Sequence, residues 1–295
     1  MNKILCIHHT DLDGAASAAV VGLAHQTDQV TYIKYNYGQE LKPEWLEGYD
    51  KVYAVDVSFR DELWVYELPN LTWIDHHKTA IDQYQGPELP GLRKIGKGAC
   101  ELCWEYFFPD QECPELIRCL STYDVWDKTR FNWEIIEKIE WGAKAKYGID
   151  PSLVICDLVR SIEYKSVSDG VIGNLRDTGE MLLNYQTRVY KSRLKEYGMI
   201  FPDFFGYKVL AMCTQDFTSK TFEAQWDPEK YDIMMPFCFH PDGFVRCSLY
   251  TSKDEIDCSY IAACLGGGGH KGAAGFQISW ESFYEFLNSS EPLKA

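Results

Sequence analysis

Three short apolar runs in the first part of the chain each lead into carboxylate and imidazole side chains. The run at 3–7 leads into His9, Asp11 and Asp13, the run at 52–55 into Asp56, and the run at 71–74 into Asp75, His76 and His77. In an open parallel sheet the carboxyl ends of the strands meet at one crevice, so we expect these side chains to come together. Carboxylates and imidazoles are ligands of two-metal hydrolytic sites, so the pattern predicts both a sheet and a metal centre.

Helix and strand signals alternate around these runs. Small residues at 14–24 predict a helix packed closely on a sheet, and residues 30–35 predict a further strand. Alternation of this kind indicates parallel strands joined by helices. Two more helices are predicted at 98–108 and 115–123, where prolines separate them.

The chain changes character near residue 200. Residues 130–200 have mostly helical periodicity, and Gly198 and Pro202 end this stretch. Short β-rich runs follow, beginning at residues 207, 233 and 244. Pro236 either shortens the second of these runs or marks an edge strand.

We therefore predict an α/β fold with two domains. An N-terminal parallel-sheet domain, the catalytic and metal-binding part, covers residues 1–185, and a helical linker covers residues 186–205. A smaller α/β domain for substrate binding covers residues 206–295 and carries a glycine-rich loop.

Composition narrows the class of protein. With 46% hydrophobic and 25% charged residues, the 295-residue chain is typical of soluble globular proteins, and it has no apolar run that could span a membrane. Its start does not resemble a signal peptide. The formal net charge of −15 disfavours tight binding to long nucleic acid, which needs a basic surface.

The 11 cysteines are scattered, and Cys100 and Cys103 form the only close pair. A zinc site would need a second pair or a suitably spaced histidine, so we interpret these two as buried core thiols. Scattered cysteines are typical of proteins from a reducing compartment, which predicts a cytoplasmic protein.

The candidate aspartates also have a structural interpretation. Asp11 and Asp13 could form an Asx turn, with Asp13 as the N-cap of the helix that follows. Asp56 could be a turn residue at a strand end, although its valine neighbours make an unpaired charge costly to bury. After the helix at 115–123, either Asp124 or Asp127 could be a surface carboxylate, and we favour Asp124 as the last metal ligand.

The adjacent histidines His76 and His77 could be two residues of a surface loop. In the functional interpretation their side chains point in different directions, so that one ligates a metal ion while the other faces the substrate. Carboxylates beside an imidazole suit Mn²⁺, Mg²⁺ or Fe²⁺ better than a site made of thiolates would.

A second signal lies in the glycine run at 266–269, which His270 and Lys271 follow. Consecutive glycines let the backbone approach a ligand closely, and their N–H groups can form an anion-binding nest. A flexible linker is the alternative, but the apolar segment 273–276 resumes at once. We therefore predict an anion-binding loop in the C-terminal domain.

Taken in order, these motifs resemble those of the DHH phosphoesterase superfamily, and residues 266–275 resemble the Gly-Gly-Gly-His motif of its C-terminal substrate domain. The resemblance covers nearly the whole chain, although residues 130–260 contribute few specific motifs. It implies two Mn²⁺ ions, with Mg²⁺ or Fe²⁺ as alternatives, held by His9, Asp11, Asp13, Asp56, His76 and Asp124. Asp56, which follows the middle strand, would bridge the ions, and His77 would contact the scissile phosphate.

The resemblance also implies that the nucleotide is bound, through its terminal phosphate or sugar, by Gly267, Gly268, Gly269 and His270. Two positions depart from the pattern. Many relatives have an imidazole four residues before the first aspartate, where this chain has Ile7, so His8 is an alternative to His9. Many also have an arginine where this chain has Tyr250, which could stack on a base while Arg246 supplies the charge. These two share a face of the strand if its pleat is regular.

Among the relatives, the glycine loop argues against family II inorganic pyrophosphatases, and the length and acidic charge argue against RecJ-type exonucleases. No sensor or membrane segment of the larger cyclic-dinucleotide enzymes is evident. We therefore expect a cytoplasmic phosphodiesterase, similar to nanoRNases, that hydrolyses short oligonucleotides or linear or cyclic dinucleotides to nucleoside monophosphates. Two metal ions would activate the attacking water by lowering its pKa.

Three other functions stay open: a phosphatase for 3′-phosphoadenosine 5′-phosphate, a single-strand exonuclease, and a nucleotide-binding module without turnover. The first would use the same metals and differ only in the leaving group. The carboxylates and both histidines argue against the third, because a pure binder has no need to activate water. We expect neither a membrane nor long duplex nucleic acid as a partner, and either a monomer or a homodimer.

Overall fold

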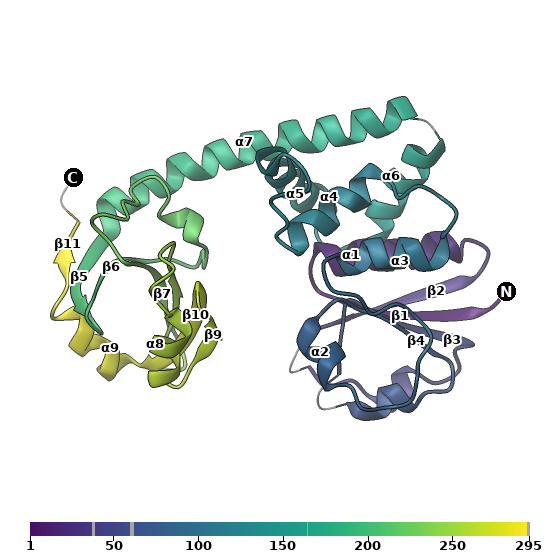
Figure 1. The fold of residues 1–295 in the computed structure, drawn as a ribbon, viewed down its shortest axis with the longest axis horizontal. Helices are drawn as coiled ribbons and strands as arrows, with labels where there is room; N and C mark the ends of the chain where they lie inside the picture. Colours follow the sequence, from purple (N-terminus) through teal and green to yellow (C-terminus); the bar gives the residue numbers. More distant parts are fainter. Residues whose placement is uncertain (37–38, 60–61, 164, 294–295) are drawn as a thin grey trace. The chain divides into compact units, whose positions relative to one another are not determined.

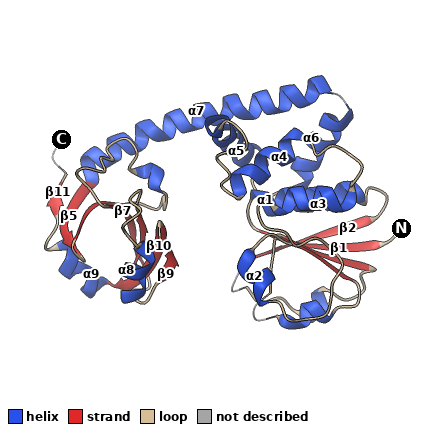
Figure 2. Cartoon of the chain, viewed as in Figure 1, coloured by secondary structure: helices blue, strands red, loops and turns tan. Residues whose placement is uncertain are grey.

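The computed structural model describes residues 1–36, 39–59, 62–163 and 165–293, and Figure 1 draws it as a ribbon. The chain divides into two compact units, Met1–Leu183 and Asn184–Ala295, each with its own sheet. Figure 2 shows that most of the helices belong to the first unit, while strands dominate the second. The predicted α/β fold class is therefore confirmed.

Four parallel strands form the sheet of the first unit, in the order β2-β1-β3-β4. Their bounds are β1 Lys3–His9, β2 Gln29–Tyr35, β3 Lys51–Val55 and β4 Leu71–Ile74. The strands that lead into the candidate ligands, β1, β3 and β4, are therefore neighbours. Because all of them pair in parallel, their carboxyl ends lie at one edge of the sheet.

Helices and 3₁₀ turns connect and cover these strands. They are α1 Leu12–Ala24, η1 Pro43–Trp45, η2 Leu63–Glu67, α2 Lys78–Gln83, α3 Ala99–Phe107, α4 Glu115–Asp124, α5 Trp133–Tyr147, α6 Pro151–Glu163 and α7 Lys165–Tyr197. Helices α3 and α4 correspond to the two predicted at 98–108 and 115–123. Helix α7 continues past residue 183 into the second unit. No helix in the described ranges is both long and apolar enough to cross a bilayer.

Side chains of the first sheet alternate between two apolar cores. Ile4 and Cys6 belong to a core that they share with α1 and α3, whereas Leu5 and Ile7 belong to a second core on the other face. A parallel sheet covered on both faces needs apolar side chains on both, which explains why its strands are continuous apolar runs. The candidate site is carried by residues at or just after the carboxyl ends of these strands, such as His9 and Asp56.

Seven strands form the sheet of the second unit, in the order β11-β5-β6-β7-β8-β10-β9. Their bounds are β5 Gly198–Phe204, β6 Tyr207–Cys213, β7 Ile233–His240, β8 Phe244–Tyr250, β9 Gly268–His270, β10 Ala273–Ser279 and β11 Glu291–Pro292. Strands β6 and β7 pair in parallel, and the other pairs are antiparallel. A 3₁₀ turn, η3 Ser219–Thr221, and helices α8 Cys258–Cys264 and α9 Trp280–Leu287 complete the unit.

Two sequence features of this unit have a different meaning in the structure. Residues 198–204, which we placed in the linker, form strand β5. Pro236 lies inside β7, between β6 and β8, so it marks neither a strand end nor an edge. The β7–β8 ladder keeps one register from Met234 opposite Tyr250 to Phe237 opposite Cys247, but Pro236 has no partner in it, so its missing N–H falls where the two strands do not pair.

Candidate functional site

The side chains expected at the carboxyl edge of the first sheet lie together in the structure. Potential ligand atoms lie within 4.8 Å of one another in three groups: His9, Asp11 and Asp56; Asp13, His76 and Asp124; and Asp56, Asp75, His76 and His77. Together these groups contain all six residues expected to ligate metal. Asp56 and His76 each belong to two groups, so they occupy the middle of the cluster.

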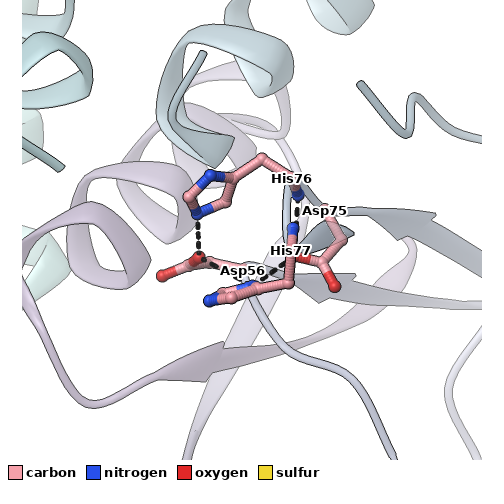
Figure 3. Close-up of side chains that lie close together, drawn as sticks. All are labelled: Asp56, Asp75, His76 and His77. Atoms are coloured by element: carbon pink, nitrogen blue, oxygen red, sulfur yellow. Dashed lines mark hydrogen bonds and ion pairs between the residues drawn. The ribbon is translucent and has the colours of Figure 1, made fainter. Parts of the chain in front are cut away.

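Asp56 follows β3 and has only 1% of its surface exposed. Neither of its carboxylate oxygens accepts a hydrogen bond within the described part of the chain, and Nε2 of His76 lies 3.2 Å from Oδ1 (Figure 3). Burial, and then the charges of Asp13 and Asp11, raise the pKa of Asp56 well above its usual range. A buried carboxylate without a donor is costly unless a cation compensates it, so Asp56 fits the role of a shared metal ligand.

The backbone of Asp56 is also strained. Its φ angle is 59°, in the left-handed region, where a non-glycine residue costs roughly 1–2 kcal/mol. Its N–H donates to the carbonyl oxygen of Ile74 at 3.0 Å, which ties the turn to the end of β4. Strained backbone that neighbouring elements hold in place is typical of functional sites.

Asp11 links the end of β1 to the start of α1. Its carboxylate accepts the N–H of Gly14 at 2.9 Å, so Asp11, rather than Asp13, is the N-cap of α1. Its second oxygen accepts Nδ1–H of His9 at 2.6 Å. Burial would raise the pKa of Asp11, but these two hydrogen bonds outweigh it and lower the pKa to about 2. Asp11 is therefore a stable anion beside Asp56.

Asp13 supports a different helix from the one that contains it. Its carboxylate accepts the N–H groups of Ala99 and Cys100 at 2.7 and 3.0 Å, at the start of α3. The capping interpretation of Asp13 therefore named the right function and the wrong helix. Burial raises the pKa of Asp13, and the nearby imidazole of His76 opposes that change. A carboxylate fixed by two N–H groups is well placed to hold a cation with its remaining lone pairs.

Asp75, His76 and His77 make different contacts, which Figure 3 draws. Asp75 is fully buried, and its Oδ1 accepts the backbone N–H groups of His76 and His77 at 2.7 and 3.2 Å. The same oxygen accepts Nδ1–H of His77 at 2.7 Å, which raises the pKa of His77. Nε2 of His76 instead lies 3.2 Å from an oxygen of Asp56 and 3.2 Å from an oxygen of Asp124. Asp75 therefore orients the imidazole of His77 and holds the backbone of both histidines, a role that the sequence left undefined.

Asp124 is the last residue of α4 and completes the cluster. Burial, followed by the charges of Asp13 and Asp11, raises the pKa of Asp124 to about 9. Asp127, the alternative, accepts hydrogen bonds from the N–H and the hydroxyl of Thr129 at 2.9 and 2.6 Å. It belongs to none of the ligand groups found among the described residues. The structure therefore brings Asp124, and not Asp127, to the site.

The structure also distinguishes the two histidines at the end of β1. His9 belongs to a ligand group, with Nδ1 3.8 Å from Oδ2 of Asp56. His8 is fully buried, donates from Nδ1 to the carbonyl oxygen of His9 at 2.8 Å and lies edge-on to the ring of Tyr32. His9 is therefore the histidine that the fold places beside the carboxylates.

A buried polar network behind the cluster was missed by the sequence analysis. The carboxylate of Glu101, only 3% exposed, accepts two hydrogen bonds from Arg130 at 2.7 and 2.9 Å. It also accepts the hydroxyl of Ser121 at 2.8 Å. The Ser121 oxygen in turn accepts the N–H of Gly98 at 2.8 Å. These bonds fasten the start of α3 to the last turn of α4.

The network supports two ligands of one group. Gly98 is the N-cap of α3, whose first N–H groups hold Asp13, and a Cβ at Gly98 would lie 2.9 Å from Oδ1 of Asp13. Ser121 lies on α4 one turn before Asp124. Glu101 could have been noticed in the sequence as a charged residue between two core cysteines of an apolar helix. We discussed only the cysteines of that segment.

Trp126 is another residue that the sequence analysis did not single out. Helix α4 ends in a Schellman motif, in which Asp127 N–H donates to Thr122 O and Trp126 N–H donates to Tyr123 O, both at 3.1 Å. This motif puts Trp126 at φ 57°, in the left-handed position that glycine usually occupies. A bulky side chain there costs roughly 1–2 kcal/mol. The sequence indicates this only by a tryptophan at the helix end, a position that is usually glycine.

The glycine-rich segment of the second unit forms a strand rather than an open loop. Residues 268–270 are β9, which pairs antiparallel with β10. Successive N–H groups of a strand point to opposite sides, so these residues do not form the expected nest of convergent donors. A Cβ at Gly267 would lie 2.1 Å from Gly275 O, and one at Gly269 would lie 2.6 Å from Ala274 Cα. Close packing on β10 therefore requires these two glycines, whereas a Cβ at Gly268 would meet open space.

Arg246 and Tyr250 lie on one face of β8, because the residues that alternate with them, Val245, Cys247 and Leu249, are buried. The guanidinium carbon of Arg246 lies 4.8 Å from the ring centre of Phe217, and the Tyr250 hydroxyl donates to Phe217 O at 2.8 Å. A groove of about 490 Å³ is lined by Arg246 and Gly267 among others. The other four residues expected to bind substrate, Gly268, Gly269, His270 and Tyr250, are not among those lining it.

Several known proteins are similar to this chain. No protein-family model matches it. Uncharacterized protein R106 of Acanthamoeba polyphaga mimivirus is 25% identical over 319 residues, which cover 94% of this chain and 67% of that protein.

Solved structures share the fold over almost the whole chain. The pGpG-specific phosphodiesterase PggH from Vibrio cholerae has a TM-score of 0.54 at 13% identity, over 98% of this chain and 97% of that one. RecJ from Thermus thermophilus, in complex with Mn²⁺, has a TM-score of 0.53 at 17% identity, over 98% and 51%. The DHH domain of PF0399, a member of the S1p family of ribosomal proteins, has a TM-score of 0.54 at 14% identity, over 98% and 85%. The chain therefore has the fold of DHH-domain proteins, as its motifs predicted.

Proposed function

We propose that this protein is a metal-dependent phosphodiesterase that hydrolyses short oligonucleotides or dinucleotides to nucleoside monophosphates. The observation that carries the proposal is Asp56, a buried carboxylate that accepts no hydrogen bond from the residues that the structure describes and that belongs to two groups of potential metal ligands. A structural carboxylate would be satisfied by hydrogen-bond donors, as both oxygens of Glu101 are by Arg130 and Ser121. The fold likeness to a pGpG-specific phosphodiesterase supports a small nucleotide substrate.

The donor set supports a pair of divalent ions. His9, Asp11 and Asp56 would hold one ion, and Asp13, Asp56, His76 and Asp124 would hold the other. Oxygen and imidazole donors without thiolates suit Mn²⁺, with Mg²⁺ or Fe²⁺ as alternatives, and RecJ of the same fold is in complex with Mn²⁺. When bound, the ions would supply an activated water and neutralise charge on the phosphoryl oxygens.

His77 is proposed to contact the scissile phosphate. A carboxylate can only accept a hydrogen bond, so the bond to Asp75 assigns a hydrogen to Nδ1 of His77. The same bond raises the pKa of His77 and so favours the protonated imidazole. A cationic imidazole beside the metal ligands would stabilise the negative charge on the phosphoryl oxygens.

We assign substrate binding to the second unit. The exposed guanidinium of Arg246 provides positive charge in the groove that Gly267 also lines. Gly268, Gly269 and His270 would hold the terminal phosphate or sugar from the exposed strand β9, and Tyr250 would help to place the base. The division into a catalytic domain at 1–185, a linker at 186–205 and a substrate-binding domain at 206–295 belongs to this proposal, except that residues 198–204 of the linker are strand β5 of the second sheet.

A reducing, cytoplasmic compartment also belongs to the proposal. All 11 cysteines are free, and Cys100 and Cys103 are buried in the core of the first unit. None of the ligand groups found in the described ranges contains a cysteine, so the thiols have no partner in the metal centre.

Incubation of the full chain with Mn²⁺ and a panel of substrates tests the proposal. The panel contains linear dinucleotides, a cyclic dinucleotide, a short RNA and 3′-phosphoadenosine 5′-phosphate, and chromatography resolves the products. We expect nucleoside monophosphates from the dinucleotides, with turnover that depends on added metal. If elemental analysis confirms bound metal and no diester is cleaved, the proposal is wrong. Phosphate release from the monoester alone would favour the phosphatase.

A further inference from the structure

Trp126 has an exposed aromatic ring and follows Asp124, a candidate metal ligand, by two residues. The residue is 54% exposed, and its backbone holds the left-handed conformation described above. Asp124, two residues earlier, has Oδ2 only 3.2 Å from Nε2 of His76. Two residues of chain span at most ~7 Å, so the backbone of Trp126 lies beside the ligand cluster.

A cation lies against the same ring. Nζ of Lys128 is 4.9 Å from the ring centre of Trp126 and 5.3 Å from that of Trp133. Trp133 packs edge-to-face on Trp126, with ring centres 4.6 Å apart, and stacks on Tyr123 at an interplanar angle of 6°. Trp126 is therefore the exposed end of a packed aromatic cluster, which holds its ring in place.

The charge of Lys128 is available to a ligand. Among the described residues, Lys128 has no carboxylate partner within ion-pair distance, although the chain has a net charge of −15. Other lysines do form ion pairs, as Lys138 does with Glu134 and Glu180. An exposed ring with an unpaired ammonium beside it offers stacking and anion contacts in one place.

We propose that Trp126 and Lys128 form a stacking site for a nucleobase of the substrate, beside the metal-binding cluster. This inference rests on the proposed function, because it states how the same site would recognise a nucleotide. Aromatic rings next to cations bind bases of single-stranded nucleic acid, and they tolerate every base because each has a flat face. The ligand class is therefore a nucleotide with either a purine or a pyrimidine, and not inorganic pyrophosphate or polyphosphate.

Tyr250, the residue that the sequence suggested for stacking, is less suited to it. Its hydroxyl donates to Phe217 O at 2.8 Å, and its side chain is partly buried. Trp126 has the larger ring and the greater exposure. Base recognition is therefore assigned first to the unit that also holds the ligand cluster.

Trp45 provides a matched control in the same unit. It is 45% exposed, and Nζ of Lys42 lies 5.9 Å from its ring centre, so it repeats the pairing of an exposed tryptophan with a lysine. It lies two residues before Glu47, which lines a groove with Lys3 and Gln29. Those two residues begin β1 and β2, at the edge of the sheet opposite the ligand cluster.

Calorimetric titration of the full chain in Mn²⁺ with AMP and with ribose 5-phosphate separates base recognition from phosphate recognition. We expect the wild type to bind AMP more tightly than ribose 5-phosphate. Trp126→Ala should weaken AMP binding roughly tenfold and change ribose 5-phosphate binding by less than about twofold. Trp126→Phe should recover part of the AMP affinity, and Trp45→Ala should change neither ligand.

Three results would overturn the proposal. They are equal AMP affinity in Trp126→Ala and the wild type, an equal loss for both ligands in Trp126→Ala, and equal wild-type affinity for AMP and ribose 5-phosphate. The second result would indicate a structural role for the ring.

Trp126→Gly separates folding from binding. Glycine suits the left-handed position, so this variant should unfold at a temperature no lower than that of Trp126→Ala. It should nevertheless lose as much AMP affinity as Trp126→Ala. The test needs no turnover, so its failure is distinct from failure of the proposed function, which would appear as a wild type that cleaves no diester.

Discussion

The ligand cluster of the first unit and the glycine segment of the second both follow apolar stretches of sequence. They differ in whether their polar atoms have hydrogen-bond partners. Asp56 is 1% exposed, and neither of its oxygens accepts a hydrogen bond within the described residues. Residues 268–270 are exposed, and their backbone pairs with β10. The first region holds atoms that only a positive partner would satisfy, whereas the second is stable as it stands.

The two regions also differ in what holds them in place. Asp13 is held by N–H groups 86 and 87 residues away along the chain, and Glu101 behind it is held by Arg130. Gly267 instead packs so closely on the backbone of Gly275 that a side chain would not fit there. Long-range polar bonds around buried charge indicate a site built to position ligands, and close backbone packing indicates a structural device.

Among the substitutions that test this comparison, we expect Asp56→Asn to have the largest effect. We expect a loss of diesterase activity of roughly 10³-fold or more, because a neutral amide removes the shared anion from the metal centre. Asparagine tolerates the left-handed backbone, so the metal-free variant should be at least as stable as the wild type. Initial rates on a dinucleotide and thermal unfolding without metal measure the two effects. Asp127→Asn is the control, and unchanged rates in Asp56→Asn would remove Asp56 from the shared position.

Glu101→Gln tests whether the buried network positions the ligands. We expect Mn²⁺ affinity to fall by about 10–100-fold, because Arg130 loses its bidentate partner and the start of α3 moves away from Asp13. Excess Mn²⁺ should restore much of the activity, since Glu101 touches no reacting group. Glu105→Gln on the same helix, where the pairing is with exposed lysines, should change Mn²⁺ affinity little. Equal Mn²⁺ affinity in Glu101→Gln and the wild type would refute a positioning role.

Gly267→Ala and Gly268→Ala test the interpretation of the second region. A Cβ at Gly267 would lie 2.1 Å from a backbone oxygen, so we expect a loss of about 1–3 kcal/mol in the free energy of unfolding. A Cβ at Gly268 would meet no atom within 4 Å, so its replacement should change that energy by less than about 0.5 kcal/mol. Urea unfolding measures both. An equal effect of the two substitutions would show that backbone packing does not explain these glycines.

The smallest effect is a pH dependence of the metal-free protein. The folded-state pKa of Asp56 is raised, and that of Asp124 is raised from 3.8 to about 9, so the unfolded state releases these protons first as pH increases. Stability should therefore fall between about pH 4 and pH 9, by at least about 1 kcal/mol or ~2–4 °C in Tm. Thermal unfolding at several pH values should show this slope, and saturating Mn²⁺ or Asp56→Asn should flatten it. A Tm that rises over this range would contradict the raised pKa values of Asp56 and Asp124.

Local patterns were sufficient for much of the first unit. The apolar runs predicted β1, β3 and β4 because each strand is buried on both faces, and charged residues then gather at or just after the strand ends. Asp56 and the pair His76 and His77 were identifiable for that reason. Pro236 shows where this reasoning fails, because a proline fits a central strand only where the neighbouring strand leaves its position unpaired, and the sequence does not show that position.

By itself, the sequence determined which side chains stand at the ends of strands, because an apolar run and the residues after it are contiguous in the chain. Only the tertiary structure decided that Asp13 supports α3, that His9 rather than His8 joins the cluster, and that Glu101 pairs with Arg130. Each of these outcomes depends on elements far apart in the chain that pack against one another. The role proposed for Trp126 depends on tertiary structure in the same way, since the way α4 ends sets its backbone conformation and the packing of Trp133 on it fixes its ring.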